Sequence, residues 1–256
     1  STYFMALEIK QPDALEYNEN LIKAQTIGTV KALINAKRKA VLITSDTTTE
    51  NAEADVATFF RQVMKYLDTS ASSALSLTAS DFTIYEIPDE FEGVVFGTSG
   101  HRGQRDVQLS AGIAAAIGQG ISEFINDEAQ FQGKDKLLVI GSDTRPNNMA
   151  YQEEQSRIAL ANGLKVLAFE EVMPTPMCAF AIRFGDRIIH LSENEVIVGG
   201  IHNTPSHNKP SDDGIKFNPG GMYEGAPSHP EVNKYVVARS NDIIQEGKGI
   251  QRLSDS

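Results

Sequence analysis

The sequence predicts an α/β protein in which a layered mixed sheet is flanked by helices and preceded by an α/β region at the N-terminus. From residue 111 onward, short apolar runs rich in β-branched residues alternate with longer segments of helical period. Loops with glycine and hydroxyl residues follow several of these runs, as they do at strand ends in α/β proteins. A composition of 41% hydrophobic and 22% charged residues over 256 positions allows a sizeable core.

The chain divides into residues 1–90, a region of unknown role, and residues 91–256, which carry the candidate site. In the first region, Thr49 has the chemistry of a helix cap, so the hydroxyl-rich run 45–49 is interpreted as a helix start. A phosphate or metal loop is the alternative. The elements expected in this region are helices over 15–37 and 49–67, strands over 39–43 and 82–87, and a polar linker over 70–80.

In the second region, apolar spacing distinguishes helices from strands, and glycine or proline marks several of their ends. Gly163 ends one helix, and Pro174 and Pro176 break the chain before the next. The expected helices cover 111–124, 149–162, 177–184 and 231–246, the expected strands cover 136–141, 165–169, 188–191, 196–201 and 215–218, and 247–256 is expected to be a polar tail.

The candidate nucleophile is Ser206, in a loop that follows a β-branched apolar run. α/β proteins place ligands at strand ends of this kind. Pro205 fixes the backbone before the serine, and His207 is a candidate proton acceptor beside its hydroxyl. Thr204 and Asn208 can tie the turn to its own backbone. A turn without catalytic role is the alternative, because Thr-Pro-Ser-His-Asn is also ordinary turn chemistry.

A second loop, residues 96–103, has the composition of a phosphate-binding loop. It holds three glycines, two hydroxyl residues and one arginine in eight positions. Backbone N–H groups in such a loop can turn inward on an anion, and Arg102 can bind phosphate oxygens with both arms of its guanidinium. Thr98, Ser99 and Arg102 are therefore the candidate phosphate-binding residues.

Together with Asp213–Asn218, these strings resemble the α-D-phosphohexomutase superfamily, and Phe-Gly-Thr-Ser-Gly-His-Arg-Gly is most like its phosphoglucomutase branch. The resemblance covers about residues 91–245 and corresponds to the first of the family's four domains. It implies a domain I-like fold and an isomerase that interconverts glucose 1-phosphate and glucose 6-phosphate. Ser206 would carry the phosphoryl group, with glucose 1,6-bisphosphate as intermediate and activator.

The resemblance also implies roles for individual residues. Ser206, His207 and Lys216 are the expected catalytic residues, with Lys216 or His207 moving the proton of the sugar hydroxyl. An Asp-Asp-Gly turn into a strand is the alternative explanation for the segment that carries Lys216. One Mg²⁺ is implied, held by Ser206 through its phosphate, with its remaining ligands outside this chain.

The sequence departs from the family pattern at several positions. Asn203 occupies an apolar position of the serine string, and Lys209 replaces the proline that directly follows the Ser-His-Asn triplet. Ser142 stands where the family usually has a basic residue. In the same loop, Asp143 or Thr144 either caps a helix or helps to hold the active-site loop.

Three further family strings are absent from the 256 residues: the Asp-Gly-Asp-Gly-Asp-Arg metal loop, the sugar-recognition Gly-Glu-Glu-Ser string and the phosphate-binding Ser-Gly-Thr string. The mutase domains that carry them are therefore expected in cis or in trans. A non-catalytic sugar-phosphate-binding or regulatory protein is the alternative, and a structural domain with decayed motifs is a third hypothesis.

Charge and hydropathy limit the expected partners. The net charge of −11 disfavours nucleic acid, whereas a few local cations suffice to bind a small sugar phosphate. No apolar run is long enough to span a membrane, so no membrane partner is expected. The single cysteine, Cys178, cannot form an internal disulfide, which favours a cytoplasmic location.

Overall fold

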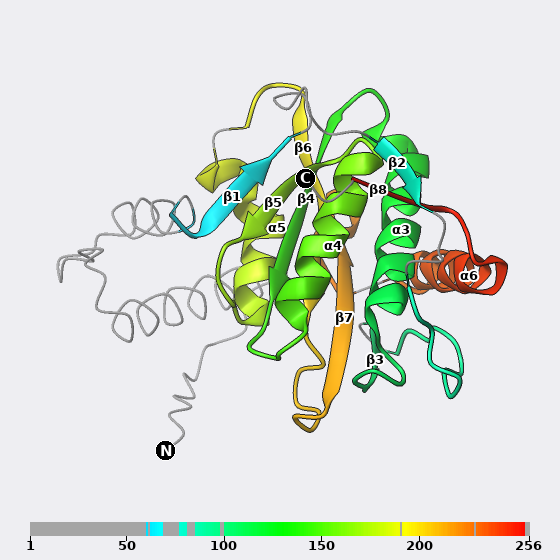
Figure 1. Cartoon of the computed structure of the whole chain (residues 1–256). Coiled ribbons are helices and arrows are strands. Elements are labelled where there is room, and N and C mark those ends of the chain that lie inside the picture. Colours follow the sequence, from blue (N-terminus) through cyan, green and yellow to red (C-terminus); the bar gives the residue numbers. More distant parts are fainter. Residues whose placement is uncertain are drawn as a thin grey trace, which may run out of the picture.

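The computed structural model describes residues 60, 62–68, 77–80, 85–97, 100–189, 191–227 and 229–253. Their central sheet is built from β1 (Met64–Leu67), β3 (His101–Gln104), β4 (Asp135–Ser142), β5 (Lys165–Phe169), β6 (Glu195–Asn203) and β7 (Asp212–Pro219). The strand order is β1-β5-β4-β6-β7-β3 (Figure 1). β4, β5 and β6 run parallel, and the other strands are antiparallel to their neighbours. The predicted α/β class with a mixed sheet is confirmed.

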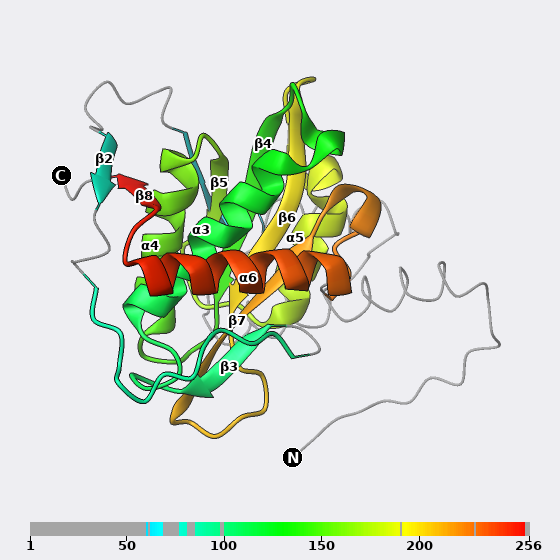
Figure 2. The same ribbon diagram turned by 90° about the vertical axis from the view of Figure 1, so that its right-hand side faces the viewer.

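Helices cover both faces of this sheet (Figures 1 and 2). α3 (Ala111–Asp127), α4 (Asn148–Ala161) and α6 (Pro230–Glu246) lie on one side, and α5 (Thr175–Ile188) lies on the other. β2 (Leu77–Ser80) and β8 (Ile250–Leu253) form a separate antiparallel pair, with β8 against α4. None of the described helices combines the length and the apolar character needed to cross a bilayer.

Side-chain alternation along β4 gives the sheet two cores. Leu138 and Ile140 pack on the side of α3, α4 and α6, whereas Leu137 and Val139 pack on the side of α5. All four side chains are fully buried. Because helices cover both faces, this central strand is a continuous apolar run in the sequence, and its position could be predicted.

Small residues let α3 pack closely between two other helices. A Cβ atom at Gly120 would lie 3.0 Å from Ser240 Oγ and 3.2 Å from Val236 O, both on α6. A Cβ atom at Gly118 would lie 3.2 Å from Gln155 Cγ on α4. The glycines therefore allow α3 to approach α6 and α4 closely within the helical layer.

Most elements expected in the second region are observed. The expected helices correspond to α3, α4, α5 and α6, and four of the expected strands correspond to β4, β5, β6 and β7. The elements expected over 15–37 and 39–43, and the run 45–49, lie outside the described residues. Of the helix expected over 49–67, Phe60 and residues 62–63 are helical.

Three expectations are wrong where segments distant in the sequence pair with each other. Residues 64–67, expected to end a helix, form β1 and pair with β5. Residues 77–80, expected in a linker, form β2 and pair with β8, which was expected to be a polar tail. Ile250 and Leu253 of β8 are buried, which explains why this short segment is ordered against the helices. β1 and β2 thus connect the region before residue 90 to the rest of the described fold.

Two expected strands are not strands in the described residues. The strand expected over 188–191 is replaced by the end of α5, where the Ile189 N–H still donates to Gly185 O. Residues 85–87, the described part of the strand expected over 82–87, are irregular. In both segments the apolar residues pack against helical neighbours, so their spacing reflects burial and not strand pairing.

Candidate active site

Ser206 lies in a tight turn directly after β6. Its φ of 61° is in the left-handed region, where a residue other than glycine needs local support. Thr204 provides it, because its Oγ1 accepts a hydrogen bond from the Ser206 N–H at 3.0 Å. The predicted tie between Thr204 and the backbone of the turn is confirmed. Asn208 instead donates from Nδ2 to Asp212 Oδ2 at 3.0 Å.

The Lys216 ammonium contacts the serine hydroxyl. Its Nζ donates a hydrogen bond to Ser206 Oγ over 2.5 Å. β7 returns antiparallel to β6 and pairs Lys216 with His202, which places the lysine beside the turn that β6 enters. Burial and the nearby charge of Arg102 lower the pKa of Lys216, and Asp143 partly opposes this effect. A lowered pKa makes the neutral amine more accessible, as proton transfer requires.

Three other predicted site residues are not seen in contact with the hydroxyl. His207 is exposed and has no hydrogen-bond partner among the residues that the structure describes. Thr98 and Ser99 lie outside the described residues. Of the two candidates for moving a proton at Ser206, the geometry therefore favours Lys216.

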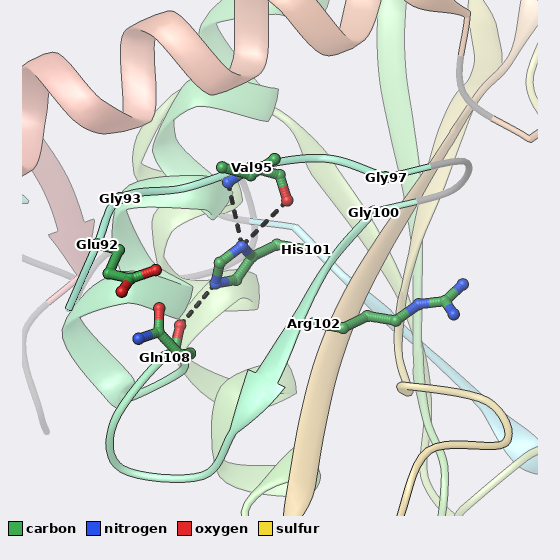
Figure 3. A pocket seen from close by; sticks show the side chains of 8 residues that line it. All are labelled: Glu92, Gly93, Val95, Gly97, Gly100, His101, Arg102 and Gln108. Carbon is green, nitrogen blue, oxygen red and sulfur yellow. Dashed lines mark hydrogen bonds between the residues drawn. The ribbon is translucent and has the colours of Figure 1, made fainter. Parts of the chain in front are cut away.

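Arg102 approaches the same site from β3. It lies opposite Gly214 of β7, two residues before Lys216. Neighbouring strand residues point to opposite faces, and Figure 3 shows the side chains of His101 and Arg102 diverging. Arg102 is exposed, and its charge is close enough to lower the pKa of Lys216. The structure thus brings Ser206, Lys216 and Arg102 together from three segments.

A cavity of about 520 Å³ is lined by residues of the segment 92–97, by Gly100, His101 and Arg102, and by Gln108 (Figure 3). His101 Nε2 donates to Gln108 O at 2.6 Å, and Nδ1 accepts a hydrogen bond from the Val95 N–H at 3.2 Å. His101 therefore joins the segment before residue 96 to the turn after β3.

No sequence motif predicted a role for Arg145, yet its guanidinium binds the backbone of the serine loop. It donates to two carbonyl oxygens of this loop, those of Asn208 and Lys209, and to the carbonyl oxygen of Asp212, the first residue of β7. Asp143 accepts the Arg145 N–H at 3.0 Å. The N-cap of α4, Asn147, makes no side-chain cap bond, and Asp143 lies well before it, so holding the loop is the role that the geometry supports for Asp143.

A buried histidine lies beneath the site on β6. His202 Nε2 donates to Met173 O at 2.8 Å, so Nδ1 is the acceptor for the Thr175 hydroxyl at 3.1 Å. Burial lowers the pKa of His202 to about 4. The neutral ring ties the segment with Pro174 and Pro176 to the sheet, next to its cross-strand neighbour Lys216.

A family model described as phosphoglucomutase/phosphomannomutase, alpha/beta/alpha domain I, matches residues 93–245, more than half of the 256 residues. The match includes Ser206, Lys216 and Arg102. The chain belongs to this family.

Relatives in the phosphoglucomutase/phosphomannomutase family are much longer than this chain. A phosphoglucomutase of Komagataeibacter xylinus is 32% identical over 164 residues, 63% of this chain and 28% of that protein. A phosphoglucosamine mutase of Nocardioides sp. is 31% identical over 123 residues, 48% of this chain and 25% of that protein. The solved structure of parafusin, a phosphoglucomutase from Paramecium, has a TM-score of 0.48 and 23% identity, and the match covers 72% of this chain and 29% of parafusin. The chain spans about a quarter of the length of these relatives.

Two departures from the phosphoglucomutase/phosphomannomutase pattern are accommodated in the interior. Ser142 is fully buried and donates from Oγ to Asn148 O at 2.8 Å, so its hydroxyl is used inside the fold. Asn203 is also fully buried, and its amide exchanges hydrogen bonds of 2.9 and 3.1 Å with the amide of Gln155 on α4. Paired amides offset the cost of burying them, so a polar residue is tolerated at this position.

The described part of this mutase-family domain does not by itself offer a complete metal site. It contains no group of three or more His, Cys, Asp or Glu side chains placed to hold an ion. Asp213 is fully buried and accepts two hydrogen bonds from Arg105, at 2.9 and 3.0 Å. Asp212 accepts the Asn208 amide. Both carboxylates near Ser206 therefore already stabilise the loop and strand around it.

Proposed function

We propose that this chain is the phosphoryl-carrying domain of a phosphohexomutase that interconverts glucose 1-phosphate and glucose 6-phosphate. The observation that carries the proposal is the 2.5 Å hydrogen bond from Lys216 Nζ to Ser206 Oγ, in a turn that holds the serine in a left-handed conformation. Family membership and relatives named phosphoglucomutase and phosphoglucosamine mutase support a hexose phosphate as the substrate class. The phosphoglucomutase relative supports glucose as the hexose.

In the proposed reaction, a hydroxyl oxygen of the sugar monophosphate attacks the phosphorus of phosphorylated Ser206. The bond from phosphorus to Ser206 Oγ breaks, and glucose 1,6-bisphosphate forms. The hydroxyl proton ends on Ser206 Oγ, and in this proposal Lys216, whose Nζ contacts that oxygen, carries it. The bisphosphate then returns its other phosphoryl group to Ser206. Arg102, with Thr98 and Ser99 as further proposed ligands, would neutralise phosphate oxygens during transfer.

One Mg²⁺ is part of the proposal, bound to the phosphate on Ser206, with its remaining ligands outside this chain. When bound, the ion would supply electrostatic stabilisation of the transferred phosphoryl group. The other mutase domains are the proposed partners in cis or in trans, since the chain spans about a quarter of its relatives. A cytoplasmic location and the absence of a nucleic-acid partner stay predictions.

The test is the intact mass of the chain after incubation with glucose 1,6-bisphosphate. We expect the wild type to gain one phosphoryl group and Ser206→Ala to gain none. Ser211→Ala, which removes an exposed hydroxyl in the same loop, is the control and should label like the wild type. Labelling that persists in Ser206→Ala would contradict the nucleophile. Binding of glucose phosphates by calorimetry without any labelling would favour the alternative, a non-catalytic binding protein.

A further inference from the structure

The Arg145 side chain bridges two loops that follow neighbouring parallel strands. It starts in the loop after β4 and reaches the loop after β6, which carries Ser206. Nη1 lies 2.7 Å from Lys209 O and 2.8 Å from Asp212 O, and Nη2 lies 2.8 Å from Asn208 O. Only 13% of the Arg145 side chain is exposed. The backbone from residue 208 to residue 212 therefore curves around one partly buried guanidinium.

Protein groups occupy most of the donors of Arg145. Three of its five N–H groups point to the loop carbonyls, and Nε lies 3.5 Å from Asp143 Oδ2. The Asp143 carboxylate also offsets the charge of the guanidinium. A phosphate bound at Ser206 could gain little from Arg145 without breaking a contact to the loop. Arg145 therefore acts on the position of the loop and not directly on a phosphate.

A second arginine, Arg105, binds a different carbonyl of the same loop. Its Nη2 donates to Pro210 O at 3.0 Å, in the half of the loop farther from Ser206. Within the loop, the Asn208 N–H is 3.4 Å from Pro205 O, which is a long hydrogen bond, whereas the Asp212 N–H donates to Lys209 O and Asn208 Nδ2 donates to Asp212 Oδ2, both at 3.0 Å. In the described structure, Arg145 is the side chain that binds the carbonyl of Asn208, two residues after Ser206.

We infer that Arg145 is a positioning residue that holds the Ser206 turn where Lys216 Nζ reaches Ser206 Oγ. The inference rests on the proposed phosphoryl-carrying role of Ser206. Without the guanidinium, three carbonyls lose a donor, and of these Lys209 O keeps the Asp212 N–H at 3.0 Å. The turn that carries Ser206 can then shift relative to β7. A misplacement of about 1 Å can reduce a rate by roughly 100-fold.

The first experiment compares Arg145→Lys with Arg157→Lys as the matched control. Lysine keeps the positive charge but replaces a planar fork with a single ammonium, which cannot serve three carbonyls in the same geometry. Arg157 lies on α4 and pairs with the exposed Glu153, far from the loop contacts. The rate of Ser206 phosphorylation is measured over a range of glucose 1,6-bisphosphate concentrations. For Arg145→Lys we expect a maximal rate lower by about 10- to 100-fold and a similar half-saturating concentration, whereas the control matches the wild type.

Hydrogen exchange of the amides of residues 206–212 gives a second measurement that does not require phosphorylation. We expect faster exchange confined to this loop in Arg145→Lys. An unchanged maximal rate, unchanged loop exchange, or faster exchange throughout the chain with a lower melting temperature would each overturn the inference. If the wild type takes up no phosphoryl group, the proposed function fails, and the exchange measurement still decides whether Arg145 holds the loop.

Discussion

Lys216 and Arg102 are two positive side chains near Ser206 that differ in burial. This difference is the reason why a different role is proposed for each. Lys216 is half-buried, and burial together with the charge of Arg102 lowers its pKa. An amine with a lowered pKa can exchange a proton closer to neutral pH. Arg102 is exposed on β3, and a guanidinium stays charged and binds oxygens with two donors. The burial of each residue therefore supports the proposed proton transfer at Lys216 and the proposed phosphate binding at Arg102.

Arg102→Lys is expected to weaken binding of glucose 1-phosphate by about 1.5–3 kcal/mol, because an ammonium does not reproduce a two-armed contact. Stability should change little, since Arg102 is exposed. Calorimetric titration and thermal unfolding measure the two effects. Arg105→Lys is the control and should mainly lower the melting temperature, because Arg105 binds the buried Asp213 through two donors. A less stable Arg102→Lys with unchanged affinity would identify Arg102 as a structural residue.

His202 is expected to make stability depend on pH in the acid range. Burial lowers its pKa from 6.5 to about 4, with Lys216 adding to the shift and Asp143 opposing it. The pKa of His202 is lower in the folded state than in the unfolded state. Its contribution to the free energy of unfolding is therefore present above pH 6.5 and is lost as the pH falls towards 4. The total loss is about 3 kcal/mol. His202→Gln keeps a donor and an acceptor without titrating, so unfolding free energies from urea titrations should vary less with pH over this interval. His207→Gln, at an exposed site, is the control. If both variants reduce the pH dependence of the unfolding free energy equally, His202 is excluded as its cause.

At the scale of elements, β6, the loop at 204–211 and β7 act as one unit. The antiparallel pairing of β6 with β7 brings Lys216 back to the turn that carries Ser206. β7 also passes directly under the start of this loop at Gly214, where an added Cβ would lie 2.7 Å from Thr204 O and 2.8 Å from Pro205 Cα. The site therefore requires glycine at position 214, where β7 passes under Thr204 and Pro205.

Gly214→Ala is expected to displace the loop and slow phosphorylation of Ser206, at a cost in stability of about 1–3 kcal/mol from the close backbone contacts. Gly133→Ala is the matched control. Gly133 has a φ of 73° and no atom within 4 Å of an added Cβ, so alanine there adds backbone strain of about 1 kcal/mol without contacting the site. The phosphorylation rate and the unfolding free energy are measured for both variants. If Gly214→Ala and Gly133→Ala have equal phosphorylation rates and equal unfolding free energies, the close contact of Gly214 with the start of the loop does not position Ser206.

At the scale of the whole molecule, the sequence predicts elements whose signal is local and misses those that depend on distant partners. Leu138 and its neighbours form a continuous apolar run because both faces of β4 are covered. β1 and β8 are four residues each, and their strand character comes from pairing with β5 and β2, which no local pattern shows.

The same limit applies to the site. Ser206, Arg102 and Lys216 lie in recognisable strings, and the structure brings these three residues together. For the string that contains Arg145, the sequence suggested a loop-holding role only for Asp143 or Thr144, and the Arg145 contact with the serine loop exists because β4 and β6 are neighbours in the sheet. Strand order is set by long-range packing, so a role that depends on it could be found only once the fold was known.

The chain alone is expected to take up a phosphoryl group at Ser206 but to interconvert glucose phosphates slowly or not at all. Its described residues contain no cluster of three acidic, histidine or cysteine ligands, and the Asp-Gly-Asp-Gly-Asp-Arg string is absent from the sequence. Stabilisation by a metal and its ligands contributes several kcal/mol to lowering such a barrier, and each ~1.4 kcal/mol is about tenfold in rate. A coupled assay for glucose 6-phosphate, with Mg²⁺ or with a chelator and with Ser206→Ala as the blank, measures this turnover. Steady Mg²⁺-dependent turnover by the chain alone would show that the metal ligands have been misplaced, and Asp212 and Asp213 would then have to leave their present partners to bind the ion.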